Sequence, residues 1–164
     1  KSAVLGNPSK GFKQFLKTLT GGRITIGALG LGTAQGAFAR ALEYSQEREA
    51  FGKSINNFQG ISFKLSDMAT QIEAARHLVY YAAWKKDQGL PVIREAAMAK
   101  LFSSETAMQV TTEAIQVLGG YGYIKEYDVE RFFRDAKILE IGEGTSEVQR
   151  MIIAKDLIQS VQTV

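Results

Sequence analysis

The sequence predicts an all-α fold, an antiparallel four-helix bundle, on three observations. Apolar side chains recur with helical spacing along several long segments, and we find no strand of consequence. Glycine-bearing turns separate these segments, as expected for the connections between helices. The 164 residues, none of them cysteine, suffice for one domain that buries its core without disulfides or a metal. We therefore expect residues 1–164 to form a single helical domain.

The N-terminal part of the sequence predicts two helices in succession. An apolar series spaced i, i+3, i+4, i+7 starts at Phe12 and predicts a first helix from Gly11. We expect Gly21 and Gly22 to interrupt it, and a longer helix to run from about residue 23 to residue 48.

That longer helix is unusually rich in small residues at interior positions. Each interior glycine costs a helix about 1 kcal/mol relative to alanine, so several of them require compensation. We infer close approach by a neighbouring helix, and a helix broken near residues 30–32 is the alternative. The small residues are Gly27, Ala28, Gly30, Gly32, Ala34, Gly36, Ala37 and Ala41.

The third helix carries the clearest pattern, an apolar stripe that advances alternately by four and three residues. We expect Gly89 to cap its C-terminus and Pro91 to start a fourth helix that ends near Leu118. A short helix over 127–136, a loop over 141–144 and a last helix over 145–161 complete the prediction. The stripe consists of Ile61, Leu65, Met68, Ile72, Ala75, Val79 and Ala82.

Composition excludes several kinds of site. Without cysteine, iron–sulfur clusters and thiolate-ligated zinc are impossible, and His77 alone cannot form a multi-histidine metal site or a conventional Ser–His–Asp triad. We therefore predict no metal site. Twenty basic against seventeen acidic residues, net +3, do not make a nucleic-acid footprint. No apolar run reaches the roughly 18 residues of a membrane span, and no signal peptide is recognisable.

Three glycine-bearing connections are the candidate sites. Glu143 stands between two glycines, which let the backbone approach a ligand closely, and the next helix offers free N–H groups at its start. A helix-capping loop with a solvated glutamate fits the same spacing. The segment from Gln116 to Tyr123 has three glycines in four residues, which suits a loop against a phosphate or a flat ring. A plain interhelical turn is the alternative, because neither a Walker lysine nor a preceding strand is present.

The third candidate lies at the end of the long second helix. Arg48, Phe51 and Gln59 combine a guanidinium for a pyrophosphate, a ring for a base and an amide for a base edge. An arginine that interacts only with the helix dipole is the simpler interpretation of Arg48.

Together and in this order, the three segments resemble the C-terminal helical domain of the acyl-CoA dehydrogenases, over essentially the whole chain. The most specific match runs from Gln116 through Gly119-Gly120 to Asp135, where every constrained position of the family's C-terminal signature fits. The stretches 48–59 and 141–150 resemble the family's flavin-contacting segment and catalytic loop.

The resemblance implies a flavoprotein oxidoreductase of fatty acid β-oxidation, which dehydrogenates an acyl-CoA thioester at its α,β-bond and transfers hydride to FAD. Glu143 would be the base that removes the α-proton. Arg48, Phe51 and Gln59 would hold the adenine dinucleotide part of a flavin that is bound mainly by a partner subunit. The full set of implied flavin contacts is Arg48, Phe51, Gln59, Gln116, Gly119, Gly120, Thr145, Ser146 and Glu147. The implied substrate contacts are Arg23 and Gly144.

Three positions near the implied site differ within the family. Some members carry the catalytic glutamate just before the arginine that matches Arg23, where this chain has Gly22, so Glu143 is the one candidate base. Gly142 stands where many members have tyrosine, and Thr20 where aspartate is frequent. Both differences bear on the specificity for the length and shape of the acyl chain, and the sequence leaves this specificity open.

The family's N-terminal helical domain and β-domain are absent from this chain, which begins at Lys1. We therefore expect a fragment or processed product that does not turn over acyl-CoA alone. The resemblance further implies a homodimer or homotetramer, electron-transfer flavoprotein as electron acceptor, and a bacterial cytoplasmic or mitochondrial matrix location rather than secretion. An acyl-CoA oxidase, or a non-catalytic helical assembly domain, are the alternative functions.

Overall fold

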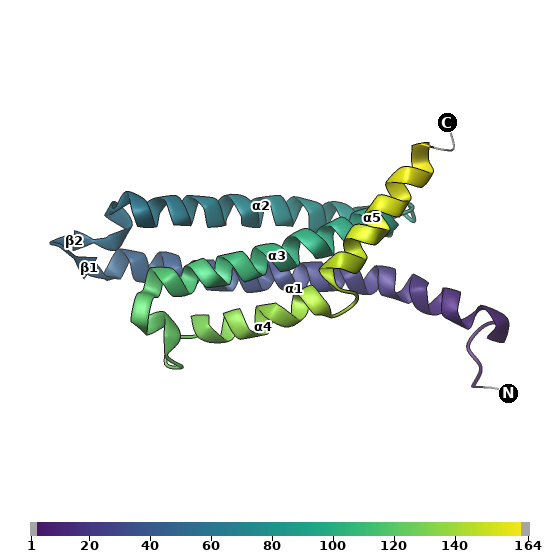
Figure 1. Cartoon of the computed structure of the whole chain (residues 1–164), viewed down its shortest axis with the longest axis horizontal. Helices are drawn as coiled ribbons and strands as arrows, with labels where there is room; N and C mark the ends of the chain where they lie inside the picture. Colours follow the sequence, from purple (N-terminus) through teal and green to yellow (C-terminus); the bar gives the residue numbers. More distant parts are fainter. Residues whose placement is uncertain (1–2, 162–164) are drawn as a thin grey trace.

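The computed structural model describes residues 3–161, which form long helices joined by short connections (Figure 1). The elements are a 3-10 turn η1 (Pro8–Lys10), α1 (Gly11–Glu47), β1 (Glu49–Ala50), β2 (Lys53–Ser54), a 3-10 turn η2 (Ile55–Asn57), α2 (Gln59–Asp87), α3 (Ile93–Leu118), a 3-10 turn η3 (Gly119–Tyr123), α4 (Val129–Ile141) and α5 (Ser146–Val161).

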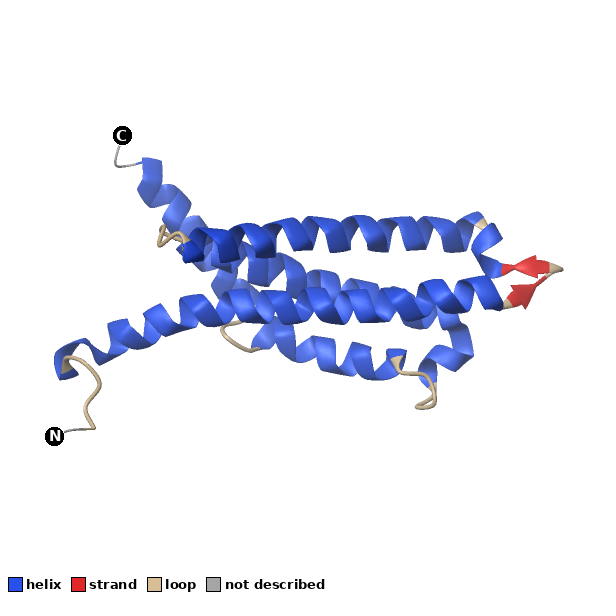
Figure 2. Ribbon diagram, turned by 180° about the vertical axis from the view of Figure 1, so that it is seen from behind, coloured by secondary structure: helices blue, strands red, loops and turns tan. Residues whose placement is uncertain are grey.

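Helices α1 to α4 lie side by side and alternate in direction, and α5 leaves the bundle at an angle (Figure 1). The expected antiparallel four-helix bundle is therefore confirmed. The hairpin β1–β2 closes one end of the bundle, and both chain termini lie at the other (Figure 2). None of the helices within residues 3–161 is long and apolar enough to cross a membrane.

The expected break at Gly21 and Gly22 is wrong, because α1 runs without interruption from Gly11 to Glu47. The alternative break near residues 30–32 is absent as well. Local glycine content favoured interruption, but the helix is stabilised by its neighbours. It packs against α2, α3 and α4, most extensively against α3.

The small residues of α1 allow that close packing. A Cβ atom added at Gly30 would lie 2.9 Å from the backbone oxygen of Ser103 in α3. A Cβ atom added at Gly27 would lie 3.3 Å from the backbone of α3. At Gly36 a Cβ would lie 3.0 Å from an aromatic ring of α4. Gly32 is exposed, with nothing within 4 Å of such a Cβ. Close helix approach is therefore confirmed for three of the four glycines.

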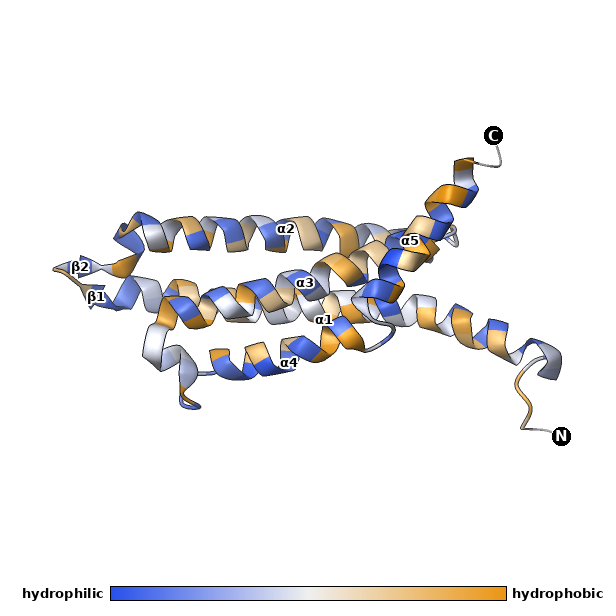
Figure 3. Ribbon diagram, in the orientation of Figure 1, coloured by the Kyte–Doolittle hydropathy of each residue, from blue (hydrophilic) through white to orange (hydrophobic). Residues whose placement is uncertain are grey.

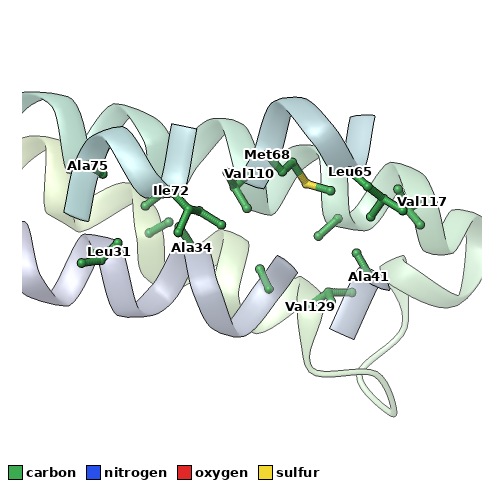
Figure 4. Close-up of a cluster of buried hydrophobic side chains, with 14 of the residues drawn as sticks. Leu31, Ala34, Ala41, Leu65, Met68, Ile72, Ala75, Val110, Val117 and Val129 are labelled. Atoms are coloured by element: carbon green, nitrogen blue, oxygen red, sulfur yellow. The ribbon is translucent and has the colours of Figure 1, made fainter. Parts of the chain in front are cut away.

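The apolar stripe predicted for the third helix faces the core of the bundle. Six of its seven residues are buried, and the seventh, Ile61, is partly buried and packs against the core. Figure 4 shows how the side chains of α1, α2, α3 and α4 meet in the interior. The labelled core residues are Leu31, Ala34, Ala41, Leu65, Met68, Ile72, Ala75, Val110, Val117 and Val129.

Two helix boundaries differ from the predictions. Gly89 adopts φ +69° after α2, as expected of a C-terminal cap, but α3 begins at Ile93 rather than at Pro91. Helix α4 spans Val129–Ile141 instead of 127–136. It continues because Leu139, one turn beyond the predicted end, is buried in the core.

The N-terminal turns of α1 and the second half of α5 extend beyond the bundle and carry apolar residues there (Figure 3). Phe12 and Phe15 are 78% and 61% exposed, and Ile158 is 61% exposed. Such apolar exposure on a domain is typical of surfaces that contact other parts of a protein.

Candidate functional site

Glu143 lies in the short connection between α4 and α5, held in an unusual backbone conformation. Its φ is +56°, and that of Gly144 is +93°. Left-handed backbone is uncommon for a residue with a side chain, costs on the order of 1–3 kcal/mol, and persists where the surroundings enforce it. The two successive left-handed residues turn the chain sharply, and the Glu143 carboxylate faces α1.

The carboxylate of Glu143 packs against α1 at Gly22, the position at which some members of the family carry their catalytic glutamate. A Cβ atom at Gly22 would lie 2.7 Å from Oε2 of Glu143. The next residue, Arg23, is 6% exposed. Burial lowers the pKa of the Arg23 guanidinium, and the nearby negative charge of Glu143 opposes that shift. The base and the substrate-side arginine implied by the resemblance are thus neighbours.

Unpartnered buried polar atoms gather around this connection. Within residues 3–161, six buried side-chain oxygen or nitrogen atoms have no hydrogen-bond partner. Four of them belong to residues of the connection or the adjoining turns of α1 and α5. Buried polar atoms are normally bonded, so a cluster of orphans marks a place where another group supplies partners. The four are Arg23 Nε, Glu143 Oε2, Ser146 Oγ and Gln149 Oε1.

Two fully buried side chains, one from α3 and one from α5, donate hydrogen bonds to the backbone of this connection. The Lys100 ammonium of α3 donates to the Gly144 carbonyl at 2.8 Å. The Gln149 amide of α5 donates to the same oxygen at 2.8 Å and to the Glu143 carbonyl at 3.2 Å. Sequence reasoning missed Lys100. The available signal was a lysine among the small residues of a buried helix face, which is a rare place for an unpaired charge.

The three residues predicted to contact flavin at the start of α5 differ in exposure. Thr145 caps the helix, its Oγ1 accepting from the N–H of Val148 at 3.4 Å. Ser146 is buried, and Glu147 is exposed on the first turn. Bonding to its own backbone N–H and to Thr145 lowers the pKa of Glu147.

The second candidate site is a pocket at the far end of the bundle, where α1 and α3 both end. It has a volume of about 520 Å³ and contains Arg48, Gly119 and Gly120. The Arg48 guanidinium carbon lies 6.0 Å from the centre of the Tyr121 ring. No atom comes within 4 Å of a Cβ built on either glycine, so their backbone is open to a ligand. The full lining is Tyr44, Arg48, Ile55, Val117, Leu118, Gly119, Gly120, Tyr121 and Ile124.

The other predicted cofactor residues at this end are exposed and do not line the pocket. Phe51 is 96% exposed at the tip of the hairpin, with φ +53°. Its ring meets that of Phe58 edge-on, with the centres 6.1 Å apart. Gln59 opens α2, and Gln116 faces outward on the last turn of α3.

The structure therefore divides the predicted site residues into one group around Glu143 and a second group around Arg48. From Gly22, beside Glu143, to the end of α1, beside Arg48, the helix covers about 38 Å at its normal rise. His77 is exposed on α2, and no three histidine or acidic side chains within residues 3–161 are grouped as metal ligands.

Comparison with known proteins gives one consistent result. Residues 9–158 match the family model described as acyl-CoA dehydrogenase, C-terminal domain. A short-chain specific acyl-CoA dehydrogenase of Megasphaera elsdenii is 55% identical over 156 residues, covering 95% of this chain and 41% of that protein. The human mitochondrial short-chain specific enzyme is 49% identical, covering 99% of this chain and 40% of its own length.

Solved structures agree with the sequence relatives. The structure of butyryl-CoA dehydrogenase from Megasphaera elsdenii superposes with a TM-score of 0.93 at 56% identity, covering 94% of this chain and 40% of that one. The chain thus spans about two fifths of the length of the relatives it matches. The helical bundle, the glycine-flanked glutamate and the family match lead to one conclusion: the chain belongs to the acyl-CoA dehydrogenase family and corresponds to its C-terminal domain.

Proposed function

We propose that the protein containing this chain dehydrogenates a short-chain acyl-CoA thioester at its α,β-bond, with Glu143 as the base and FAD as the hydride acceptor. The observation that carries the proposal is the buried, unpartnered Oε2 of Glu143 beside the buried Arg23. The short-chain preference rests on the two short-chain enzymes that are 55% and 49% identical to the chain.

The surroundings of Glu143 suit the removal of a proton from carbon. Its Oε2 accepts no hydrogen bond from the described residues, so a lone pair is available for the α-proton. The positive charge of Arg23 and the positive end of the α5 helix dipole can stabilise the negative charge that develops on the thioester oxygen. Gly22 leaves room on the α1 side of the carboxylate.

The residues at both ends of the bundle fit a dinucleotide cofactor. Arg48 supplies a guanidinium for a pyrophosphate, and the open backbone of Gly119 and Gly120 can lie against it. When bound, FAD supplies the hydride acceptor. The separation of about 38 Å between Arg48 and the Glu143 connection exceeds the length of one extended FAD molecule. We therefore assign the two ends to two different flavins, as in a homodimer or homotetramer whose subunits share each cofactor.

The complete protein is expected to contain further domains around this chain. The relatives are about two and a half times longer, and the exposed apolar ends of α1 and α5 provide surfaces for such domains. We propose that the chain alone is inactive and that residues 1–164 form one domain of a larger enzyme. A chain that is 53% identical occurs in a solved structure described as the electron transferring flavoprotein of Acidaminococcus fermentans, which supports such a flavoprotein as acceptor.

The relatives also include an acryloyl-CoA reductase, 49% identical to the chain. Reduction uses the same proton transfer in reverse, so Glu143 would deliver the α-proton instead of removing it. Measuring both directions with the complete protein decides which one is favoured.

The test is anaerobic bleaching of flavin in the complete protein on mixing with butyryl-CoA. Glu143→Gln should slow bleaching by roughly 10²–10⁴-fold, the usual contribution of a general base. Glu73→Gln, which removes an exposed carboxylate from α2, should bleach normally. Unchanged bleaching in Glu143→Gln would disprove the assignment of the base. Reoxidation of the reduced protein by oxygen, compared with electron-transfer flavoprotein, separates an oxidase from a dehydrogenase.

A further inference from the structure

We propose that Lys100 is a positioning residue for the catalytic glutamate: with Gln149 it fixes the Gly144 carbonyl and thereby the direction of the Glu143 side chain. The inference rests on the proposed role of Glu143 as the base. Lys100 belongs to α3, whereas Glu143 lies in the connection between α4 and α5.

The position of Lys100 is unusual for a charged residue. Its side chain is fully buried, and its ammonium contacts a backbone carbonyl, while the carboxylates of Glu140, Glu105 and Glu147 act on it only through their charge. The Lys100 ammonium donates a hydrogen bond to the Gly144 carbonyl at 2.8 Å. Burial lowers the pKa of the Lys100 ammonium, because the charged form loses its hydration. Burying an ammonium that is not in direct contact with a carboxylate is costly, and the hydrogen bond to the Gly144 carbonyl is the contact that accompanies this cost.

Gln149 of α5 holds the same Gly144 carbonyl and also the carbonyl of Glu143. Its amide donates to the Gly144 carbonyl at 2.8 Å and to the Glu143 carbonyl at 3.2 Å. The two peptide groups that flank Gly144 are therefore both anchored, one of them twice. The anchors come from α3 and α5, so the connection cannot turn without separating from one of the two helices.

These anchors explain how the left-handed backbone at Glu143 is maintained. A φ of +56° is strained for glutamate and would relax if its neighbouring peptide groups were free. Relaxation would rotate the Cα–Cβ bond and move the carboxylate away from Gly22. A displacement of about 1 Å at a reacting group can cost 10²-fold in rate. Lys100 thus acts on the rate through Glu143, while substrate binding should depend on it little.

The experiment compares three variants of the complete, FAD-loaded protein. Lys100→Met removes the ammonium and keeps most of the volume, and Gln149→Met does the same for the amide. Thr111→Val is the control, since it removes a buried polar atom from α3 that bonds only within that helix. Two measurements are made: kcat and KM with butyryl-CoA, and hydrogen exchange of amides in residues 142–149.

We expect Lys100→Met to lower kcat by 10-fold to 100-fold with KM within about 2-fold of the parent, and to speed amide exchange in residues 142–149 selectively. Gln149→Met should do the same, and the double variant should be little worse than either single one, because both donors hold one carbonyl. Thr111→Val should change neither kcat nor exchange in the connection.

Parental kcat and parental exchange in Lys100→Met would overturn the proposal. So would a loss of stability spread over all of α3 with kcat unchanged, which is the result of a merely structural role. If Lys100→Met does not fold, Gln149→Met decides by the same two measurements. If the parent reduces no flavin with any acyl-CoA, the proposed function fails, whereas the exchange measurement still decides whether Lys100 holds the connection.

Discussion

The Glu143 carboxylate packs against the backbone of α1 at Gly22, so closely that a Cβ there would lie 2.7 Å from Oε2 and 3.0 Å from Cδ. Glu143 is more than a hundred residues away from Gly22 in the sequence. The absence of a side chain at residue 22 therefore determines where the carboxylate can lie. Because a glutamate side chain is flexible, a larger residue at 22 would displace it without disturbing the helix.

Gly22→Ala should consequently reduce the rate and spare the fold. We expect flavin bleaching in the complete protein to slow by up to about 10²-fold, as for a reacting group displaced by about 1 Å. Thermal stability should stay the same or rise, because alanine is the better helix residue. Gly32→Ala is the matched control on the same helix, where the new Cβ meets nothing within 4 Å. Equal bleaching rates in both variants would contradict the prediction.

Gly30→Ala should destabilise the bundle. The new Cβ would lie 2.9 Å from the Ser103 backbone oxygen, which belongs to a helix and cannot move away cheaply. Overpacking costs about 1–3 kcal/mol, against a gain of about 1 kcal/mol in helix propensity. Gly32→Ala keeps the gain without the clash and should raise the free energy of unfolding. Urea unfolding measures both, and equal stabilities would show that α1 and α3 can separate freely.

Arg48→Ala should weaken flavin retention without affecting the base. The guanidinium borders the pocket at Gly119 and Gly120, some 38 Å along α1 from Glu143. We expect the complete protein to lose flavin on gel filtration, and added FAD to restore bleaching. Arg76→Ala, which removes an arginine paired with Glu73 on α2, is the control. Full flavin occupancy in Arg48→Ala would exclude Arg48 from the cofactor site.

Glu95→Gln should lower stability at neutral pH and have little effect in acid. Burial alone would raise the pKa of Glu95, but the hydrogen bond and charge of Lys85, at 2.8 Å, outweigh it and hold this pKa below its usual value. A depressed folded pKa stabilises the protein above the unfolded pKa of about 4.3, and that stabilisation disappears as pH falls through the folded value.

The expected loss at pH 7 is roughly 1.5–3 kcal/mol, the range for a hydrogen bond to a charged group. Urea unfolding at pH 7 and pH 3 measures it, with Glu73→Gln as the control, since its exposed pair should contribute less than about 1 kcal/mol at either pH. A difference that persists unchanged at pH 3 would rule out the ionised pair as its source.

The sequence predicted the elements whose signals are local. The stripe of α2 was recognised because a helix that packs on one side must repeat its apolar residues at helical spacing, and Gly89 was recognised as a cap because few other residues adopt positive φ there. The length of α4 was underestimated, since burial of Leu139 depends on the neighbouring helices.

Continuity of α1 could not be read from its own residues. Gly21 and Gly22 weaken a helix wherever they stand, and what compensates for them is contact with helices much later in the sequence. The resemblance indicated Glu143 and Arg23 as site residues but gave no distances between them. That Glu143 lies next to Gly22, and therefore close to Arg23, is a consequence of helix packing, and so is the position of Arg48 at the far end of the bundle.

The sequence by itself determined the helical fold, the family and the glycine-flanked glutamate, because periodicity and short motifs involve residues close together in the chain. Only the tertiary structure decided that Lys100 of α3 and Gln149 of α5 share one carbonyl beside Glu143. A lysine on a helix is ordinarily a solvent-exposed residue. It becomes a buried anchor only when α4, α5 and their connection pack over it, and no local pattern encodes that contact.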